Sequence, residues 1–125
     1  MAKKTVEQNI EMREHTIDAS GKRLGRVATE AAHVLLGKDL PDVEKHVVAP
    51  VKVKIINASK LDISEKRAED EFQTYSGFPG GRRVETLGHL ATRRGFEEVL
   101  HRVVAGMIPK NKLHKIRMKN LEVSE

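Results

Sequence analysis

The residues best suited to chemistry gather in the stretch 75–83, which reads YSGFPGGRR. Three of the four aromatic residues in the chain, Phe72, Tyr75 and Phe78, lie in or next to it, close to two arginines. RNA recognition uses aromatic planes for unstacked bases, arginine for phosphates and bare backbone for close approach. The stretch therefore predicts RNA contacts at Tyr75, Ser76, Gly77, Phe78, Pro79, Gly80, Gly81, Arg82 and Arg83. In the alternative interpretation, Phe72 and Phe78 anchor a loop to the core and the arginines are merely solvated.

A second basic stretch, 106–115, reads GMIPKNKLHK. Pro109 ends one helical pattern, and Asn111 is suited to cap a short helix that follows. Lysines near a helix N-terminus suit phosphate, because the free N–H groups and the helix dipole favour an anion there. The predicted contacts are Lys110, Asn111, Lys112, Lys115 and Lys119. The alternative is an ordinary helix–proline–helix corner with a lysine-rich exterior.

A third stretch, 20–26, reads SGKRLGR and lies between a predicted strand and a predicted helix. Phosphates bind at such places, because unpaired N–H groups and the helix dipole point at the loop. The stretch lacks the G-x-G-x-x-G spacing, and the chain has no G-x-x-x-x-G-K-[ST] string. We therefore expect a tight turn whose basic residues, Lys22, Arg23 and Arg26, hold a nucleic-acid phosphate. The alternative is a small nucleotide-binding enzyme that uses the turn 20–26.

No pattern in the sequence predicts catalysis or a metal site. The six histidines, at positions 15, 33, 46, 89, 101 and 114, are never three or four residues apart, so no helical metal pair arises. The chain has no cysteine, which excludes disulfides, iron–sulfur clusters and cysteine-type zinc sites. Asp18, Ser20 and His33 lack any local signature of a catalytic triad. We expect no catalytic residue, no metal and no cofactor.

Positive charge is concentrated in the C-terminal half of the chain. Residues 1–74 carry 13 basic and 13 acidic side chains, whereas residues 75–120 carry ten basic and three acidic ones. The formal net charge of the chain is +5 and its pI is near 9.6. Such an uneven field favours a polyanionic partner, most often nucleic acid. A solubilising surface without a specific partner is the alternative.

The elements that must position these residues follow from the hydrophobic pattern. Apolar residues repeat at helical spacing over 24–35 and 96–108, whereas 51–57 alternates as a strand does. With a first strand at 15–19, the order strand, helix, strand predicts a parallel sheet. The remaining predictions are a helical or irregular segment at 62–72, an irregular loop at 75–83, a helix capped by Thr86 and ended by Gly95, a short helix after Asn111 and a strand at 121–124.

The length of 125 residues suits one domain. Residues 1–14 are polar and carry both signs of charge, so they have the features of neither a secretory signal nor a transit peptide. We expect a flexible N-terminal extension at 1–14 and a single α/β domain at 15–125. No apolar run is long enough for a transmembrane helix, so no membrane partner is expected.

Six segments, in this order, resemble the large-ribosomal-subunit protein thirteen family. They are 17–19 (IDA), 24–26 (LGR), 37–38 (GK), 56–58 (INA), 76–81 (SGFPGG) and 106–113 (GMIPKNKL). The last two strings are long and unusual, and the six segments span nearly the whole chain. The resemblance implies an α/β fold, a three-layer α/β/α sandwich around a four-stranded, mainly parallel sheet, without catalytic activity.

The resemblance also implies a structural protein of the large ribosomal subunit that binds 23S rRNA and supports early subunit assembly. Its partners would be 23S rRNA and neighbouring large-subunit proteins, with the chain a monomer within the cytoplasmic ribosome. The matched segment 37–38 adds Lys38 to the expected RNA contacts. The sequence departs from the family pattern at Thr16, Ala49, Tyr75 and His114.

Overall fold

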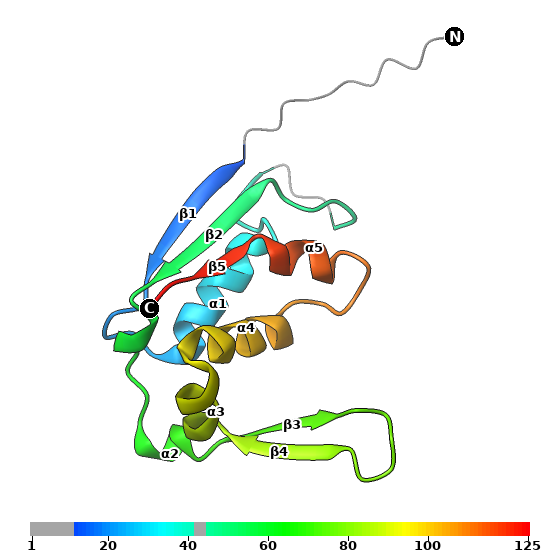
Figure 1. Cartoon of the computed structure of the whole chain (residues 1–125). Coiled ribbons are helices and arrows are strands. Elements are labelled where there is room, and N and C mark those ends of the chain that lie inside the picture. Colours follow the sequence, from blue (N-terminus) through cyan, green and yellow to red (C-terminus); the bar gives the residue numbers. More distant parts are fainter. Residues whose placement is uncertain (1–11, 42–44) are drawn as a thin grey trace.

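The computed structural model describes residues 12–41 and 45–125. Figure 1 shows how its helices and strands are arranged. In chain order they are β1 (Arg13–Asp18), α1 (Leu24–Leu35), β2 (Val51–Ile56), the 3-10 helix η1 (Ala58–Lys60), α2 (Glu65–Ala68), β3 (Glu71–Tyr75), β4 (Arg82–Thr86), α3 (Leu87–Arg94), α4 (Phe96–Met107), α5 (His114–Lys119) and β5 (Leu121–Val123). Of the expected extension 1–14, residues 1–11 lie outside the described part, and β1 begins at Arg13.

The main sheet has the order β1–β2–β5, and both strand pairs are parallel. Ile17 of β1 lies opposite Ile55 of β2, and Val53 of β2 lies opposite Leu121 of β5. The strand–helix–strand unit formed by β1, α1 and β2 is therefore as the sequence predicts. The helix 24–35 is confirmed as well, and Gly37, with a φ of 74°, follows its end.

The expected four-stranded sheet inside a three-layer sandwich is not what the structure shows. The main sheet has three strands, and in β2 Val51, Val53 and Ile55 are buried whereas Lys54 is exposed. A sheet covered on both faces needs strands that are apolar on both faces, and the alternating pattern of β2 supplies only one. The polar face instead carries an ion pair between Lys52 Nζ and Glu122 Oε1 at 2.7 Å.

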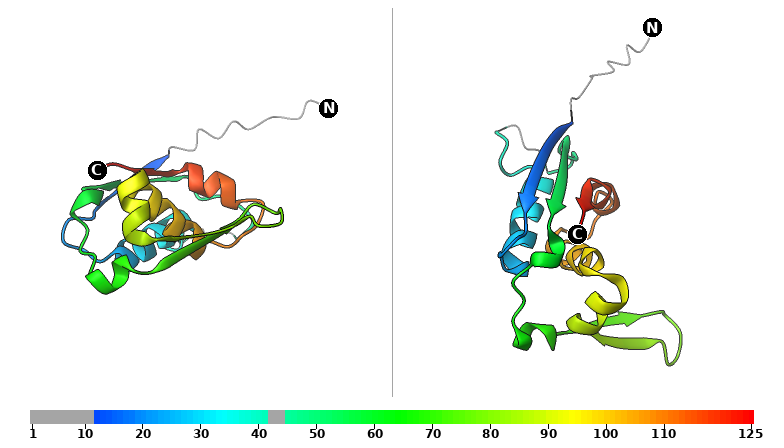
Figure 2. Two further views of the ribbon diagram at one scale, coloured as in Figure 1. Left: turned by 60° about the horizontal axis from the view of Figure 1, so that its bottom comes forward. Right: turned by 60° about the vertical axis from the view of Figure 1, so that its left-hand side comes forward.

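The two remaining strands, β3 and β4, form an antiparallel hairpin of their own. The right-hand view in Figure 2 shows it apart from the main sheet, beyond α3. The prediction of an irregular loop over 75–83 is therefore wrong at its ends, where Tyr75, Arg82 and Arg83 belong to strands. The segment 62–72 proves to contain the four-residue helix α2 and the start of β3.

Two hydrophobic clusters hold these parts together. The larger one lies between α1, α4 and the buried face of the sheet, and it includes Val27, Ile55 and Leu100. The smaller one consists of Leu87, Leu90 and Val99, with Phe72 of the hairpin packed against it. The hairpin is thus fixed to α3 and α4 at its base and is free of the main core.

The helices that support the hairpin begin and end as predicted. The Thr86 hydroxyl accepts a hydrogen bond from the His89 N–H at 3.3 Å, which caps α3. Gly95 ends α3 with a φ of 83°, a left-handed conformation that favours glycine. The chain then turns directly into α4, which ends before Pro109.

Candidate nucleic-acid interface

The tip of the hairpin, residues 76–81, depends on glycine. Gly77 and Gly80 have φ values of 89° and 74°, which side chains rarely tolerate. At Gly81 a Cβ atom would lie 2.9 Å from the carbonyl oxygen of Phe78. The Gly81 N–H donates to that same oxygen at 2.9 Å, so the loop closes tightly on itself. The tip is therefore a fixed shape with bare backbone on its surface.

The aromatic side chains of this region divide into one anchor and two exposed groups. Phe72 is half-buried on the smaller cluster, and the Arg102 guanidinium carbon lies 6.0 Å from its ring centroid. Tyr75 and Phe78 are 68% and 73% exposed. Phe72 therefore does anchor this region to the core, as the alternative interpretation expected. Phe78 does not. Two exposed aromatic planes at a rigid tip suit stacking on unpaired bases.

The pleat of the hairpin separates the two adjacent arginines. Arg82 pairs with Tyr75 across the hairpin, and Arg83 pairs with Thr74. Side chains alternate between the faces of a strand, so Arg83 shares the face of the buried Glu85, which is turned toward the helices. Arg82 lies on the opposite, outward face with Tyr75. The two arginines therefore cannot contact the same phosphate group from the same side.

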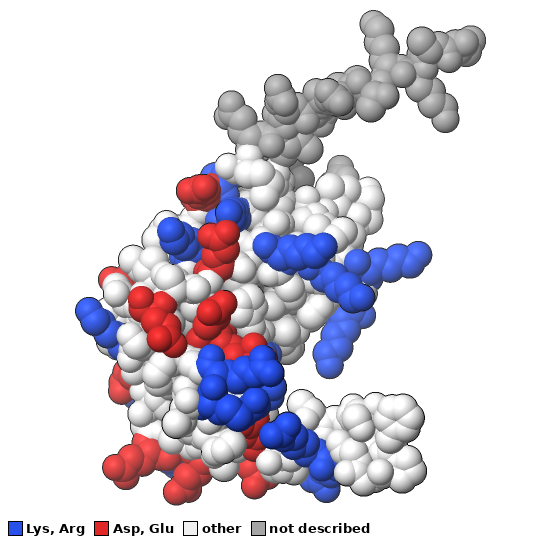
Figure 3. Space-filling view, in the orientation of Figure 1, with Lys and Arg blue, Asp and Glu red and all other residues white. Residues whose placement is uncertain are grey.

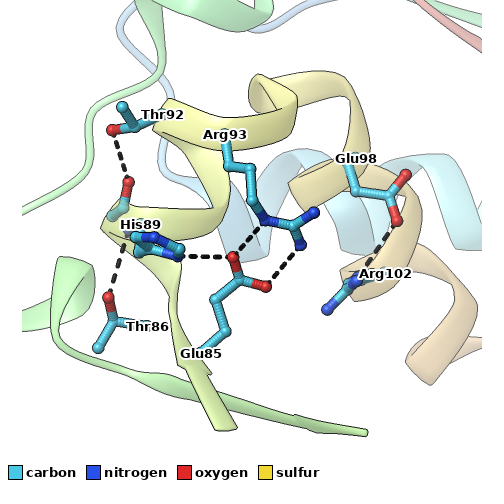
Figure 4. A network of polar contacts seen from close by, with 8 residues as sticks. Glu85, Thr86, His89, Thr92, Arg93, Glu98 and Arg102 are labelled. Carbon is cyan, nitrogen blue, oxygen red and sulfur yellow. Dashed lines mark hydrogen bonds and ion pairs between the residues drawn. The ribbon is translucent and has the colours of Figure 1, made fainter. Parts of the chain in front are cut away.

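A buried carboxylate anchors the base of the hairpin to α3 (Figure 4). Glu85 accepts two hydrogen bonds from Arg93, at 2.7 and 2.8 Å, and its Oε1 lies 2.7 Å from His89 Nδ1. The bonds from Arg93, assisted by His89, lower the pKa of Glu85 from its ordinary 4.5 to about 2. Arg93 is therefore occupied by an internal ion pair that positions the hairpin.

Basic side chains gather over α5 and the loop before it (Figure 3). Four lysines are exposed and form no ion pair with any acid in the described part of the chain: Lys110, Lys112, Lys115 and Lys119. Arg117 of the same helix is buried. The expected cap is displaced, because Asn111 Oδ1 accepts from the Leu113 N–H at 3.0 Å and α5 begins only at His114. Lys112 consequently precedes the helix.

A groove lies between strand β3 of the hairpin and the end of α4, and Lys110 of the second predicted surface lines it. One side is formed by Phe72, Gln73 and Thr74 of β3, and the other by Arg102, Ala105, Gly106, Lys110 and His114. Its volume is about 460 Å³. The sequence prediction missed Arg102 and His114 as site residues. Arg102 follows Glu98 at the spacing of a helical ion pair, at 3.2 Å, so its pattern indicated only a solvated face.

The third predicted group lies at the start of α1. Lys22, Arg23 and Arg26 line a shallow groove together with Glu30 and Asp62, so the charge there is mixed. Lys22 Nζ lies 3.8 Å from Glu30 Oε2. Lys38 is exposed beyond the far end of α1, which the rise per residue places roughly 18 Å from the helix start. The structure therefore does not bring Lys38 together with this group.

Two segments that resemble the family have a structural role in this fold. Asp18 ends β1 and accepts hydrogen bonds from the Ser20 N–H at 3.0 Å and from Asn57 Nδ2 at 3.1 Å. These bonds lower the pKa of Asp18, with the bond from Ser20 the larger cause. Asn57 itself has a φ of 57° at the end of β2. Asp18 and Asn57 therefore tie the ends of two adjacent strands together.

Neither a metal-binding group of side chains nor a membrane-spanning helix is found in the described residues. No group of three or more histidine, aspartate or glutamate side chains there is placed to hold a metal ion. Within residues 12–41 and 45–125, no helix has both the length and the apolar character needed to span a bilayer.

Comparison with known proteins agrees with the resemblance seen in the sequence. A family model described as "Ribosomal protein L13" matches residues 12–125. The chain is 37% identical to large ribosomal subunit protein uL13 of Symbiobacterium thermophilum, over 93% of this chain and 81% of that protein. It is 39% identical to the uL13 protein of Synechococcus elongatus, over 91% of this chain and 76% of that protein. Both relatives are named as proteins of the large ribosomal subunit. The chain belongs to the ribosomal protein L13 family.

Proposed function

We propose that this protein is a structural constituent of the large ribosomal subunit that binds 23S rRNA and supports early assembly of the subunit in the cytoplasm. Family membership and the names of the relatives support this proposal. The structural observation that supports it is a hairpin with two exposed aromatic rings, Tyr75 and Phe78, on the same body as four exposed lysines that have no acidic partner in the described part of the chain. Neighbouring large-subunit proteins are its further partners, and it acts as a monomer within the ribosome.

The proposed mechanism is that of a clamp. The hairpin approaches one segment of RNA with Tyr75, Phe78 and the two arginines, while the lysines of α5 neutralise the phosphates of another. Because both surfaces are fixed on one body, the distance between the RNA segments is fixed as well. Contact with six phosphates would lower the affinity about a thousandfold when salt rises from about 50 to about 200 mM. Specificity then comes mainly from RNA shape.

Sedimentation tests the proposal directly. We expect the full-length protein, added to large subunits depleted of it, to sediment with them through a sucrose gradient after a high-salt wash. A variant in which both Arg82 and Arg83 are replaced by alanine should sediment less. If the unaltered protein stays at the top of the gradient, the proposed function is wrong.

A nucleotide-dependent enzyme using the turn 20–26 is not supported. The ribosomal relatives oppose it, and the groove beside the turn mixes Lys22 and Arg26 with Glu30 and Asp62. Calorimetry with ATP should give no saturable heat. Another possible role is that of an RNA-binding regulator that acts outside the ribosome. The same sedimentation experiment distinguishes the two roles, because such a regulator would not sediment with large subunits after a high-salt wash.

A further inference from the structure

The glycines of the chain can be sorted by the reason each position needs one. Five of the nine have positive φ: Gly21, Gly37, Gly77, Gly80 and Gly95. At Gly81 a Cβ atom would lie 2.9 Å from the Phe78 carbonyl oxygen, and at Gly88 a Cβ atom would be in ordinary contact with Ala68, at 3.4 Å. The two others, Gly25 and Gly106, lie in helices, and a Cβ atom at either would meet nothing within 4 Å. Neither backbone conformation nor packing explains these two.

Gly106 is the clearer case. It is exposed in the last turn of α4, where alanine would favour the helix more than glycine does. The fold therefore loses stability through this glycine and gains no contact. Because Gly106 has no side chain, the space over the helix backbone stays open. This open space forms part of the groove between β3 and α4.

The groups around this open space are those that hold an anion. Arg102 and Lys110 lie on the same side of the groove as Gly106, together with His114, whose Nε2 is 3.1 Å from the Ala105 carbonyl oxygen. Within residues 12–41 and 45–125, the acid paired with these cations is Glu98, which accepts a hydrogen bond from Arg102. Arg83 adds a further cation on the face of the hairpin that is turned toward the helices.

The opposite wall offers a surface for a flat group. It consists of Phe72, Gln73 and Thr74 of β3, and the polar atoms of Gln73 and Thr74 can pair with base edges. A volume of about 460 Å³ is within the range of small-ligand pockets, about 300–1,000 Å³. Bases in a duplex are stacked and paired, so only an unpaired nucleotide can enter a space of this size.

We propose that this groove takes one unpaired nucleotide of the bound RNA, and that Gly106 is bare so that the nucleotide can lie against α4. Its phosphate lies toward Lys110 and Arg102, and its base toward β3. This inference rests on the proposed RNA-binding function and assigns it a site. Gly25 does not repeat the pattern, because in its cavity of about 820 Å³ Arg23 and Arg26 are accompanied by Asp62, Asp70 and Glu71.

The test fills the groove without removing a charge. In Gly106→Leu the side chain occupies this open space, and Gly106→Ala adds only a methyl group. Thr92→Leu is the matched control, because Thr92 is exposed on α3 and does not line the groove. The melting temperature is measured for each variant. Fluorescence anisotropy at low salt then gives the affinity for a labelled ten-nucleotide oligouridylate, for a 16-base-pair RNA duplex and for purified large-subunit rRNA.

We expect Gly106→Leu to bind the oligouridylate and the rRNA about tenfold or more weakly, since losing charge-assisted contacts costs that much. Gly106→Ala should keep or raise the melting temperature and lose less affinity, and Thr92→Leu should bind normally. If Gly106→Leu and the unaltered protein bind equally well, the groove does not hold a nucleotide, and the proposed function is unaffected. If Gly106→Leu loses as much affinity for the duplex as for the oligouridylate, the proposal that the bound nucleotide is unpaired is wrong. Failure of the unaltered protein to bind rRNA would overturn both.

Discussion

The lysines of the α5 region allow a quantitative prediction. Lys110, Lys112, Lys115 and Lys119 are exposed and have no acidic partner in the described structure, so each is available to a phosphate. Each phosphate contact makes the affinity fall about 3.5-fold when salt rises from about 50 to about 200 mM. Four such contacts amount to roughly 150-fold. Replacing all four lysines by alanine should therefore make binding to large-subunit rRNA about 150-fold less sensitive to this change of salt.

The assay is a filter-binding titration at several salt concentrations, which gives the slope of log affinity against log salt. A control variant with alanine at Lys52, Lys54, Lys60 and Lys66 has the same net charge but different positions. We expect its slope to stay close to that of the unaltered protein, because these lysines lie outside the proposed interface. The reasoning fails if the two variants change the slope equally, since net charge and not position would then decide the affinity.

Three further predictions follow from the geometry. In a double-mutant cycle, Arg83→Ala and Lys110→Ala should give a non-additive loss of RNA affinity, whereas Arg82→Ala and Lys110→Ala should be additive. Equal coupling in the two cycles would contradict the separation of the arginines by the pleat. The folded-state pKa of Glu85 is lowered to about 2, so the stability that Glu85 contributes is fully present above about pH 4.5 and is lost as the pH falls toward 2. In urea titrations over this pH range, the free energy of unfolding of Glu85→Gln should depend less on pH than that of the unaltered protein. Leu100→Ala should lower the free energy of unfolding by about 2–5 kcal/mol in urea, because Leu100 is fully buried in the larger cluster, and a loss below 1 kcal/mol would count against that burial.

The strand–helix–strand unit of the main sheet was predictable because its hydrophobic pattern is strong, whereas the expected fourth strand is not found in that sheet. The alternation in β2 and the helical spacing in α1 and α4 each identify one buried face. The hairpin was not predictable in the same way, because its strands bury little. In β3 and β4 only Phe72 and Glu85 are turned well into the structure, and the latter is a charged residue. Because these strands have no alternating apolar residues, the glycines of the tip were the strongest signal, and they indicated an irregular loop.

The site was predictable in its residue types and not in its arrangement. An excess of arginine and lysine near glycines and aromatic residues indicated RNA contact from the sequence alone. That Arg82 and Arg83 face opposite ways depends on the register of a hairpin that the sequence does not reveal. The nearness of Arg102 and His114 to β3 depends on tertiary packing between segments about thirty or more positions apart in the sequence.

The small size of the cluster beneath the hairpin has a consequence for how the molecule moves. Three buried side chains hold β3 and β4, whereas sixteen belong to the cluster beneath the main sheet. Backbone amides of the hairpin should accordingly exchange with deuterium well before those of β1 and β2, in a partial opening that leaves the body intact. The hairpin is therefore the part of the folded protein that opens first, while the main sheet that carries it stays folded.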